Sequence, residues 1–407
     1  MKRIAAILLL MGAATFVAAL AARAAEAPSA AARVLDLGPR KGKPVEQGDT
    51  GLYGMSLSAD AKTLWLGRAR GARKVDLATG AWKFFPGAAC DGENFTSMAD
   101  TGGALWAVTA TEGRLCRLDT ATGRWSLPGG WKMRERVFGA TKLLFVPSRE
   151  AAPGQPARLL VNGQGGPDTE GITIIDPAAQ TWLELLKTKP VYDFDAGASG
   201  IVAATWDGIL KIDTNKKFSY TLHSAHGCGA EVTGVVTDES GGSARIVIAT
   251  KPSRHTELGE AMKVFRDGVA VFAPAPGRPY SFRWRHYRRD ESKRLNADYY
   301  RLFRARDFDT PGGICWLQNG KWRRLDETKG LPSNKVLKLA DGGARLFAAT
   351  DSGLAVIEKN GMAVTKTLPG VKDVIALAPA PDGLWVAAEG NLVFFIGNAA
   401  LGVRAAK

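Results

Sequence analysis

Short runs of alternating apolar and polar residues recur along the chain, and turns rich in Asp, Asn and Gly separate them. The clearest series spans residues 330–366, GLPSNKVLKLADGGARLFAATDSGLAVIEKNGMAVTK. Alternation between such turns predicts β-strands joined as hairpins. Here it predicts an antiparallel meander with strands at Lys335–Leu339, Arg345–Ala349 and Leu354–Glu358 and a fourth strand after Asn360-Gly361. One meander leaves two open edges and an unburied face, so we expect several copies to pack together.

The pattern does recur, and polar residues that end the third strand of each copy mark its register. Their separations are 43, 57, 37, 105 and 40 residues, for Asp76, Asp119, Asp176, Asp213, Gln318 and Glu358. A period near forty with four strands per repeat is typical of a β-propeller. A seventh copy, from Asp382, stops after three strands, and the isolated strand Arg33–Leu37 is expected to complete it. We therefore predict an all-β, seven-bladed β-propeller of four-stranded antiparallel blades, formed as one domain by residues 33–400.

Several conspicuous residues have structural explanations within these repeats. Aspartates followed by Thr-Gly or Asn, as at Asp76 and Asp119, suit hairpin turns in which the carboxylate accepts backbone N–H bonds. Trp65, Trp106 and Trp385 share one strand position and are expected to pack between blades.

The residues of the clearest copy resemble a known repeat. Gly330-Leu331-Pro332-Ser333-Asn334, Asp341-Gly342-Gly343 and Gly353-Leu354 are similar to the GLPxN start, D-x-x-G turn and GL core of two-component-regulator propellers. In that family the propeller is usually the extracytoplasmic sensor of a membrane histidine kinase. The match is good over one blade and loose over the others. The resemblance thus implies the fold and a recognition role, and we expect a stand-alone protein without kinase or membrane segment.

The N-terminus predicts export. Lys2 and Arg3 precede an apolar run from Ile4 to Leu20, and Ala22-Arg23-Ala24 suits signal-peptidase cleavage. Residues 1–24 are therefore interpreted as a signal peptide and residues 25–32 as a flexible segment. An uncleaved membrane anchor is the alternative, although the run is short and Ala-rich for a membrane span. We expect a periplasmic or secreted protein, soluble after cleavage.

Residues 251–310 interrupt the fifth copy between its second and third strands. The net charge of the chain is +14, and this segment contributes much of it, with cations and aromatics interleaved at Arg283-Trp284-Arg285-His286-Tyr287-Arg288-Arg289. Loops between second and third strands share one face, called the top face here, with loops that enter each blade. Arg and aromatic side chains form binding hot spots, and basic patches attract acidic partners. The alternative is a solvated flap packed on its own blade.

The four cysteines occupy related positions. Cys90 and Cys228 precede the second and fifth copies, and Cys116 and Cys315 lie on the third strands of those copies. Export permits disulfides. We predict Cys90–Cys116 and Cys228–Cys315, although sequence alone does not fix the pairing.

Histidines offer a competing chemistry. His223 and His226 with Cys228, and His255 on the same face, could hold zinc or copper, but a second tight ligand pair is missing. A lyase resembling virginiamycin B lyase could use His226 as general base beside Asp207 or Glu231. Only four histidines exist, and no acid–base pair is fixed by spacing. We assign no cofactor and no metal, and the sequence favours a binding module over an enzyme.

The preferred hypothesis is a binding scaffold whose top face recognises a periplasmic protein, an acidic glycan or another anionic ligand. Nucleic acid is an improbable partner for an exported protein. Segment 251–310 would act as lid or anchor. The expected binding residues are Arg283, Trp284, Arg285, Tyr287 and Arg288 of that segment and Trp206 of a short top-face turn. A purely structural subunit is the remaining alternative.

Overall fold

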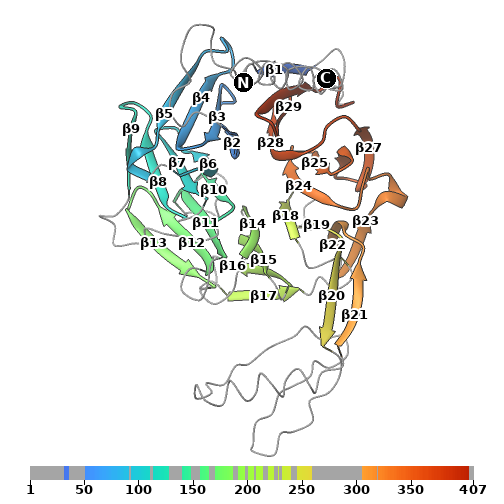
Figure 1. Ribbon diagram of the computed structural model, residues 1–407. Helices are drawn as coiled ribbons and strands as arrows, with labels where there is room; N and C mark the ends of the chain where they lie inside the picture. The colour runs from blue at the N-terminus through green and yellow to red at the C-terminus, as the bar shows by residue number, and fades with distance from the viewer. Residues whose placement is uncertain are drawn as a thin grey trace, which may run out of the picture.

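The chain folds into seven four-stranded antiparallel sheets arranged in a ring, a seven-bladed β-propeller (Figure 1). The computed structural model describes residues 32–35, 51–90, 93–110, 113–127, 140–147, 156–164, 170–186, 191–197, 200–205, 208–213, 219–223, 228, 232–239, 245–258, 305–318 and 320–402. The first strand of each blade lies nearest the axis of the ring and the fourth lies at its outer edge (Figure 1). The predicted fold class is confirmed.

Blades one to four follow one another without interruption, each made of four consecutive strands. Blade one contains β2 (Gly54–Leu57), β3 (Thr63–Arg68), β4 (Gly71–Asp76) and β5 (Trp82–Pro86). Blade two contains β6 (Phe95–Asp100), β7 (Ala104–Thr109), β8 (Leu115–Asp119) and β9 (Arg124–Ser126). Blade three contains β10 (Leu143–Val146), β11 (Arg158–Gln164), β12 (Glu170–Asp176) and β13 (Thr181–Leu185). Blade four contains β14 (Val191–Gly197), β15 (Gly200–Thr205), β16 (Gly208–Asp213) and β17 (Ser219–His223).

Blade five is assembled from two separated parts of the chain. It contains β18 (Val232–Asp238), β19 (Arg245–Thr250), β22 (Gly313–Gln318) and β23 (Lys321–Leu325). Between them, β20 (Ser253–Leu258) and β21 (Ala305–Thr310) pair only with each other among the described residues. Blade six contains β24 (Val336–Asp341), β25 (Arg345–Thr350), β26 (Gly353–Glu358) and β27 (Ala363–Leu368). Short 3₁₀ helices, Ala88–Cys90 and Glu327–Lys329, precede blades two and six.

Blade seven joins the two ends of the chain. Its first three strands are β28 (Val374–Ala380), β29 (Gly383–Ala388) and β30 (Leu392–Gly397). The fourth is β1 (Ala32–Leu35), antiparallel to β30 with Arg33 opposite Phe395. The predicted closure by an N-terminal strand is therefore confirmed, although that strand begins one residue earlier and ends two residues earlier than Arg33–Leu37. Closure removes the open edge that a three-stranded blade would expose.

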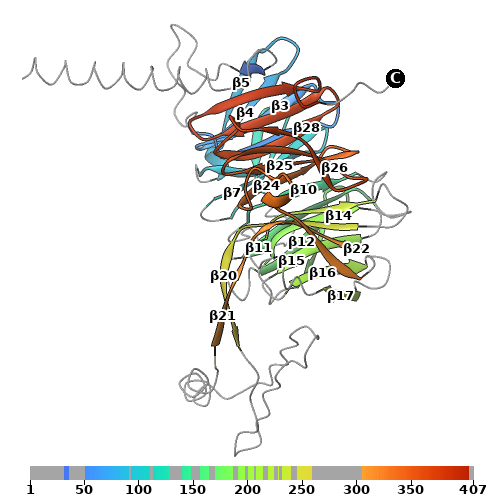
Figure 2. The ribbon, with the colours of Figure 1, turned by 90° about the vertical axis from the view of Figure 1, so that its right-hand side faces the viewer.

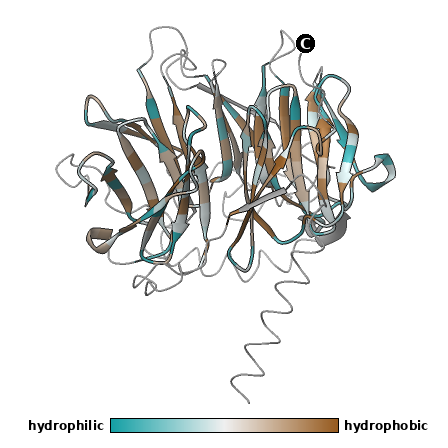
Figure 3. Ribbon diagram, turned by 90° about the horizontal axis from the view of Figure 1, so that it is seen from above, coloured by the Kyte–Doolittle hydropathy of each residue, from teal (hydrophilic) through white to brown (hydrophobic). Residues whose placement is uncertain are grey.

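The core lies between adjacent blades. Trp65, Trp106 and Trp385 are almost fully buried, and each packs against side chains of the next blade around the ring. The indole N–H of Trp65 also donates to Oδ2 of Asp100 on blade two at 2.8 Å. Hydrophobic residues follow the strands, whereas the turns are largely hydrophilic (Figure 3). These tryptophans therefore hold blades together, as their shared strand position predicts.

The polar residues that mark the repeat register occupy the predicted positions. All six end the third strand of their blades. In two of these turns, Oδ1 of Asp76 accepts the N–H of Thr79 and Oδ1 of Asp119 accepts the N–H of Thr122, both at 2.8 Å. These carboxylates stabilise turns and are not catalytic candidates. Within the described residues, no helix is long and apolar enough to cross a membrane.

Candidate functional site on the top face

A β-bulge recurs near the start of the first strand, where that strand pairs with the second. It occurs in five of the blades, with Thr96, Tyr192, Thr233, Leu337 and Ile375 as the extra residue. A bulge redirects the side chains beside it. Because the first strand starts on the top face, the five bulges define one level close to that face and around the axis.

The residues that follow these bulges share this level, which we call the axial level. They are Ser97, Asp193, Gly234, Lys338 and Ala376. Lys142 of blade three lies at the same level. It directly precedes Leu143, just as Gly234 directly precedes Val235, and the N–H groups of Leu143 and Val235 make equivalent hydrogen bonds to the preceding blade. Oγ of Ser97 accepts the N–H of Leu143 at 2.8 Å, just as Oδ2 of Asp193 accepts the N–H of Val235 at 2.6 Å. Three of these six residues are small, Ser97, Gly234 and Ala376, whereas Lys142, Asp193 and Lys338 bring charge to the same level.

Asp193 connects three blades through one carboxylate. Its Oδ1 lies 3.0 Å from Nζ of Lys142 in blade three, and its Oδ2 bonds to Val235 in blade five. The side chain of Asp193 is only 12% exposed. Surrounding protein would lower the pKa of Lys142, but Asp193 and Asp195 outweigh this effect and raise it above its ordinary value. Lys142 is therefore charged at neutral pH.

Asp195 lies two residues further along β14. Its Oδ2 accepts the N–H of Thr237 in blade five at 2.7 Å. Burial raises the pKa of Asp195 to about 6, against the opposing effect of Lys142. This carboxyl is therefore partly protonated in mildly acidic solution, where an ordinary aspartate is not.

Lys338 brings a second ammonium group to the axial level from blade six. Solvent reaches its side chain, yet protein surrounds it closely enough that burial lowers its pKa. Asp193 opposes that shift, whereas Lys142 and Lys251 add to it. Within the described residues, the ammonium of Lys338 makes no hydrogen bond or ion pair. We call Lys142, Asp193, Asp195, Lys251 and Lys338 the axial cluster.

Two exposed tyrosines lie at the start of first strands, one in blade four and one in blade one. Tyr192, the bulge residue before Asp193, is 36% exposed, and Tyr53, which directly precedes β2, is 41% exposed. None of these axial residues is among the site residues that the sequence predicts. The available signal was polar residues inside first strands, in VYDFDAG and VLKLAD, but only the bulged register shows that they come together.

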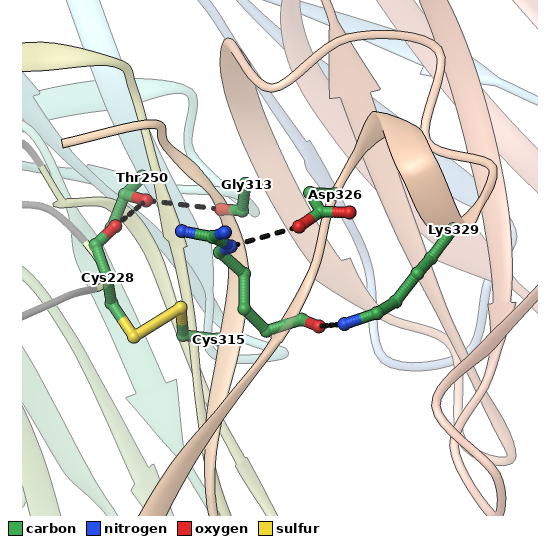
Figure 4. The surroundings of a disulfide bond; sticks show 7 residues. Cys228, Thr250, Gly313, Cys315, Asp326 and Lys329 are labelled. Carbon is green, nitrogen blue, oxygen red and sulfur yellow. Dashed lines mark hydrogen bonds and ion pairs between the residues drawn. A yellow bond between two sulfur atoms is a disulfide. The ribbon is translucent and has the colours of Figure 1, made fainter.

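Both predicted disulfides are present. Cys90–Cys116 and Cys228–Cys315 have Cα separations of 6.2 and 6.0 Å. Each ties a top-face connection to the third strand of the blade it enters. Around the second, the hydroxyl of Thr250 lies 2.6 Å from the carbonyl oxygen of Cys228 and 3.3 Å from that of Gly313 (Figure 4). The points where segment 251–310 leaves and rejoins blade five are thus braced together.

The connection into blade six supports the same region. Oδ1 of Asn334 accepts the N–H of Glu327 at 2.9 Å, and Oε1 of Glu327 accepts the N–H of Asn334 at 2.8 Å. The backbone of Gly312 packs so closely on Asn334 and Pro252 that a Cβ there would lie about 2.5 Å from their backbone atoms. The Gly-Leu-Pro-Ser-Asn stretch therefore fixes the base of the β20–β21 ribbon.

The β20–β21 ribbon extends away from the ring and beyond its outer edge (Figures 1 and 2). Its six residue pairs run from Ser253 opposite Thr310 to Leu258 opposite Ala305. The ribbon does not run over the axis, so its geometry favours the anchor over the lid. This leaves the axial level uncovered by β20 and β21.

The remaining site predictions fall largely outside the described residues. This holds for Arg283, Trp284, Arg285, Tyr287, Arg288 and Trp206, and for His226, Asp207 and Glu231 of the lyase alternative. His223 ends β17 opposite Ile209, and His255 lies on β20. Among the residues that the structure describes, no group of three or more His, Cys, Asp and Glu could hold a metal ion.

Comparisons with known proteins identify the fold. No protein family matches the sequence, and no curated protein matches it. Hydrazine synthase of Kuenenia stuttgartiensis has a TM-score of 0.54 and 13% identity over 89% of this chain and 100% of its own. The Pan2 WD40 domain of Neurospora crassa has a TM-score of 0.51 and 11% identity over 91% of this chain and 96% of its own. PorZ, a bacterial surface component of the type-IX secretion system of Porphyromonas gingivalis, has a TM-score of 0.51 and 14% identity, with 90% of this chain matching 38% of PorZ. At these identities the likeness shows a β-propeller fold and no more.

Proposed function

We propose that this protein is an exported β-propeller scaffold that docks a partner protein through segment 251–310. The observation that carries the proposal is a ribbon projecting past the blades from a braced base. A segment that only covered its own blade would gain nothing from a ribbon directed outward. A ribbon that projects from a braced base is instead suited to reaching another molecule.

The charge of the segment defines the kind of partner. Residues 251–310 contain 14 Lys and Arg and 8 Asp and Glu, a net charge of +6. Positive surface attracts and orients a negatively charged partner, and Arg and aromatic residues are favoured at the centre of protein interfaces. The partner is therefore an acidic protein surface. Export is supported by the N-terminal signal pattern and by two disulfides, which persist in oxidising compartments.

Site-directed photo-crosslinking tests this function in the compartment to which the chain is exported. A crosslinker placed at Arg285 or Tyr287 should yield a discrete protein adduct, and one placed at exposed Lys321 on the outer strand β23 should not. Replacing Arg285 and Arg288 with Glu should abolish the adduct, whereas replacing Lys321 and Arg323 with Glu makes the same charge change on the same blade and should preserve it.

Salt provides a second criterion, because screening weakens attraction between exposed charges. Adduct yield from segment 251–310 should fall as ionic strength rises. An adduct that is insensitive to both the charge reversal and salt would contradict docking by this segment. The same holds if the segment yields no adduct while the protein remains folded.

A further inference from the structure

We propose that the axial cluster is an oxyanion-binding site, in which the ammonium of Lys338 holds a carboxylate or phosphate group. This site is separate from the docking segment and goes beyond the scaffold function. Its ligand is a small acid, or one acidic group of a larger molecule, that approaches along the axis from the top face.

The first argument is the distribution of partners among the axial charges. Asp193 is already satisfied, with one oxygen on Lys142 and the other on the N–H of Val235. Lys338 interacts with Asp193 only at longer range, as it does with Lys142 and Lys251. Blade five, between the blades of Asp193 and Lys338, contributes Gly234 at this level and so adds no side chain there. Blade six packs closely on this glycine, because a Cβ on Gly234 would lie 2.6 Å from Cβ of Leu339. One ammonium group is thus left facing solvent.

The second argument is the balance of charge. Three lysines and two aspartates form the cluster, and Asp195 loses its negative charge as the pH falls through about 6. Burial and two neighbouring cations make the charged form of Lys338 costly. An anion bound to Lys338 would reverse that cost, because opposite charge nearby favours the ammonium form. A ligand oxyanion supplies the missing partner.

The third argument is that Lys338 serves no packing purpose of the repeat. Other blades carry Ser97, Gly234 and Ala376 at the axial level, so the fold tolerates a short side chain there. Tyr192, directly before Asp193 in the chain, adds exposed aromatic surface next to the cluster. Aromatic faces are suited to a sugar ring that carries the acid group, whereas free phosphate would not use them.

Calorimetric titration of the full chain with inorganic phosphate and with glucuronate tests the site. Both probes should bind the intact protein, and Lys338→Met should weaken binding roughly tenfold or more, the effect of removing a charge-assisted hydrogen bond. Lys335→Met is the matched control. It removes an exposed lysine directly before β24, whose weak ion pair with Asp351 spans 3.9 Å, and should leave affinity unchanged.

Two further variants distinguish the ligand source and the pH response. If a sugar acid is the natural ligand, Tyr192→Ala should weaken the binding of glucuronate and leave the binding of phosphate unchanged. If phosphate is the natural ligand, the variant should weaken the binding of neither probe. Binding of glucuronate, which stays ionised over this range, should strengthen as the pH falls toward about 6, because a neutral Asp195 repels the anion less. The groups that act on Asp195 are Lys142, Asp193 and the backbone N–H groups of Thr237 and Ala196. Asp195→Asn should remove this dependence.

Several outcomes would overturn the site. Equal affinity in the intact protein and Lys338→Met would do so, as would no binding of either probe at millimolar concentration by the folded protein. If Lys338→Met fails to fold, Lys338→Gln replaces it under the same criteria. The crosslinking result does not depend on this titration, so failure of the anion site leaves the scaffold function untouched.

Discussion

At the residue scale, Asp195 links the axial cluster to the pH dependence of stability. Its pKa is raised from 3.8 to about 6 in the folded protein. Between about pH 4 and 6, the folded state retains a proton that the unfolded chain has released, so stability falls as the pH rises through this window. The two pKa values correspond to at most roughly 3 kcal/mol.

Asp195→Asn should therefore flatten the stability profile in that window. The amide oxygen can still accept the N–H of Thr237, and the neutral side chain no longer titrates. The free energy of unfolding in urea, measured between about pH 4 and 7, should fall less in the variant than in the intact protein. Asp76 and Asp119 do not interfere. Hydrogen bonds in their turns lower the pKa of each, so their contributions are lost only as the pH falls below 3.8. Parallel profiles would show that Asp195 does not titrate as described.

A second residue-scale prediction concerns Lys359, a buried cation between blades five and six. Its Nζ lies 2.7 Å from Oδ1 of Asp341 and 3.5 Å from Oδ1 of Asp238, and its side chain is only 5% exposed. Lys359→Met should destabilise the protein by roughly 3 kcal/mol, because it leaves buried carboxylate without its partner. The cost lies at the low end of the usual range because Arg245 still contacts Asp238.

The check is the free energy of unfolding in guanidinium chloride. Lys335→Met, which removes an exposed lysine, should change it by less than about 0.5 kcal/mol. Equal stability of the two variants would mean that the buried ion pairs contribute little beyond exposed ones.

At the element scale, the two disulfides differ in the length of chain that they close. Cys228 and Cys315 are separated by 87 residues, and Cys90 and Cys116 by 26. A longer closed loop restricts the unfolded chain more strongly. Replacing Cys228 and Cys315 with Ala should cost about 4–5 kcal/mol and replacing Cys90 and Cys116 about 3–4 kcal/mol.

The comparison is made by denaturant unfolding of both double variants beside the intact protein. The order of the two costs is the decisive result. If the Cys90 and Cys116 variant is the less stable, loop length does not govern these bonds and local packing does.

The strands of the blades could be predicted from the sequence, whereas the axial cluster could not. Alternation and Asx turns depend on neighbours in the chain, so the third-strand ends from Asp76 to Glu358 were located to the residue. The cluster depends on bulges that slip the register by one position at Val191/Asp193 and Val336/Lys338. No local pattern marks such a slip, and the groups it brings together are some 145 residues apart in the chain.

At the scale of the whole molecule, β1 supplies the outer strand of blade seven. Leu35 is buried in the core between blades seven and one. Removing residues 25–36 should therefore destabilise the ring by more than about 2 kcal/mol, since even a single buried Leu→Ala costs this much, and should expose the edge of β30 to association.

Removal of residues 25–31 is the control, because it leaves β1 intact and should change neither property. Thermal unfolding and light scattering together provide the measurement. A variant without residues 25–36 that keeps its melting temperature and does not associate further would show that blade seven does not need its fourth strand.

The pairing of β1 with β30 also constrains when the protein can fold. The strand near the start of the chain must wait for the last strand of the propeller, more than 350 residues later. Blade seven therefore cannot be completed on a growing chain. Bringing such distant segments together is slow, because the entropy of a long loop is lost before the contact forms. Final closure is therefore a late event that requires the complete propeller. A circular permutant that joins the native ends and opens the chain between Asn360 and Gly361, the exposed tip of the turn between β26 and β27, would make the β1–β30 contact local. The pairing of the two chain ends would then fall in blade six.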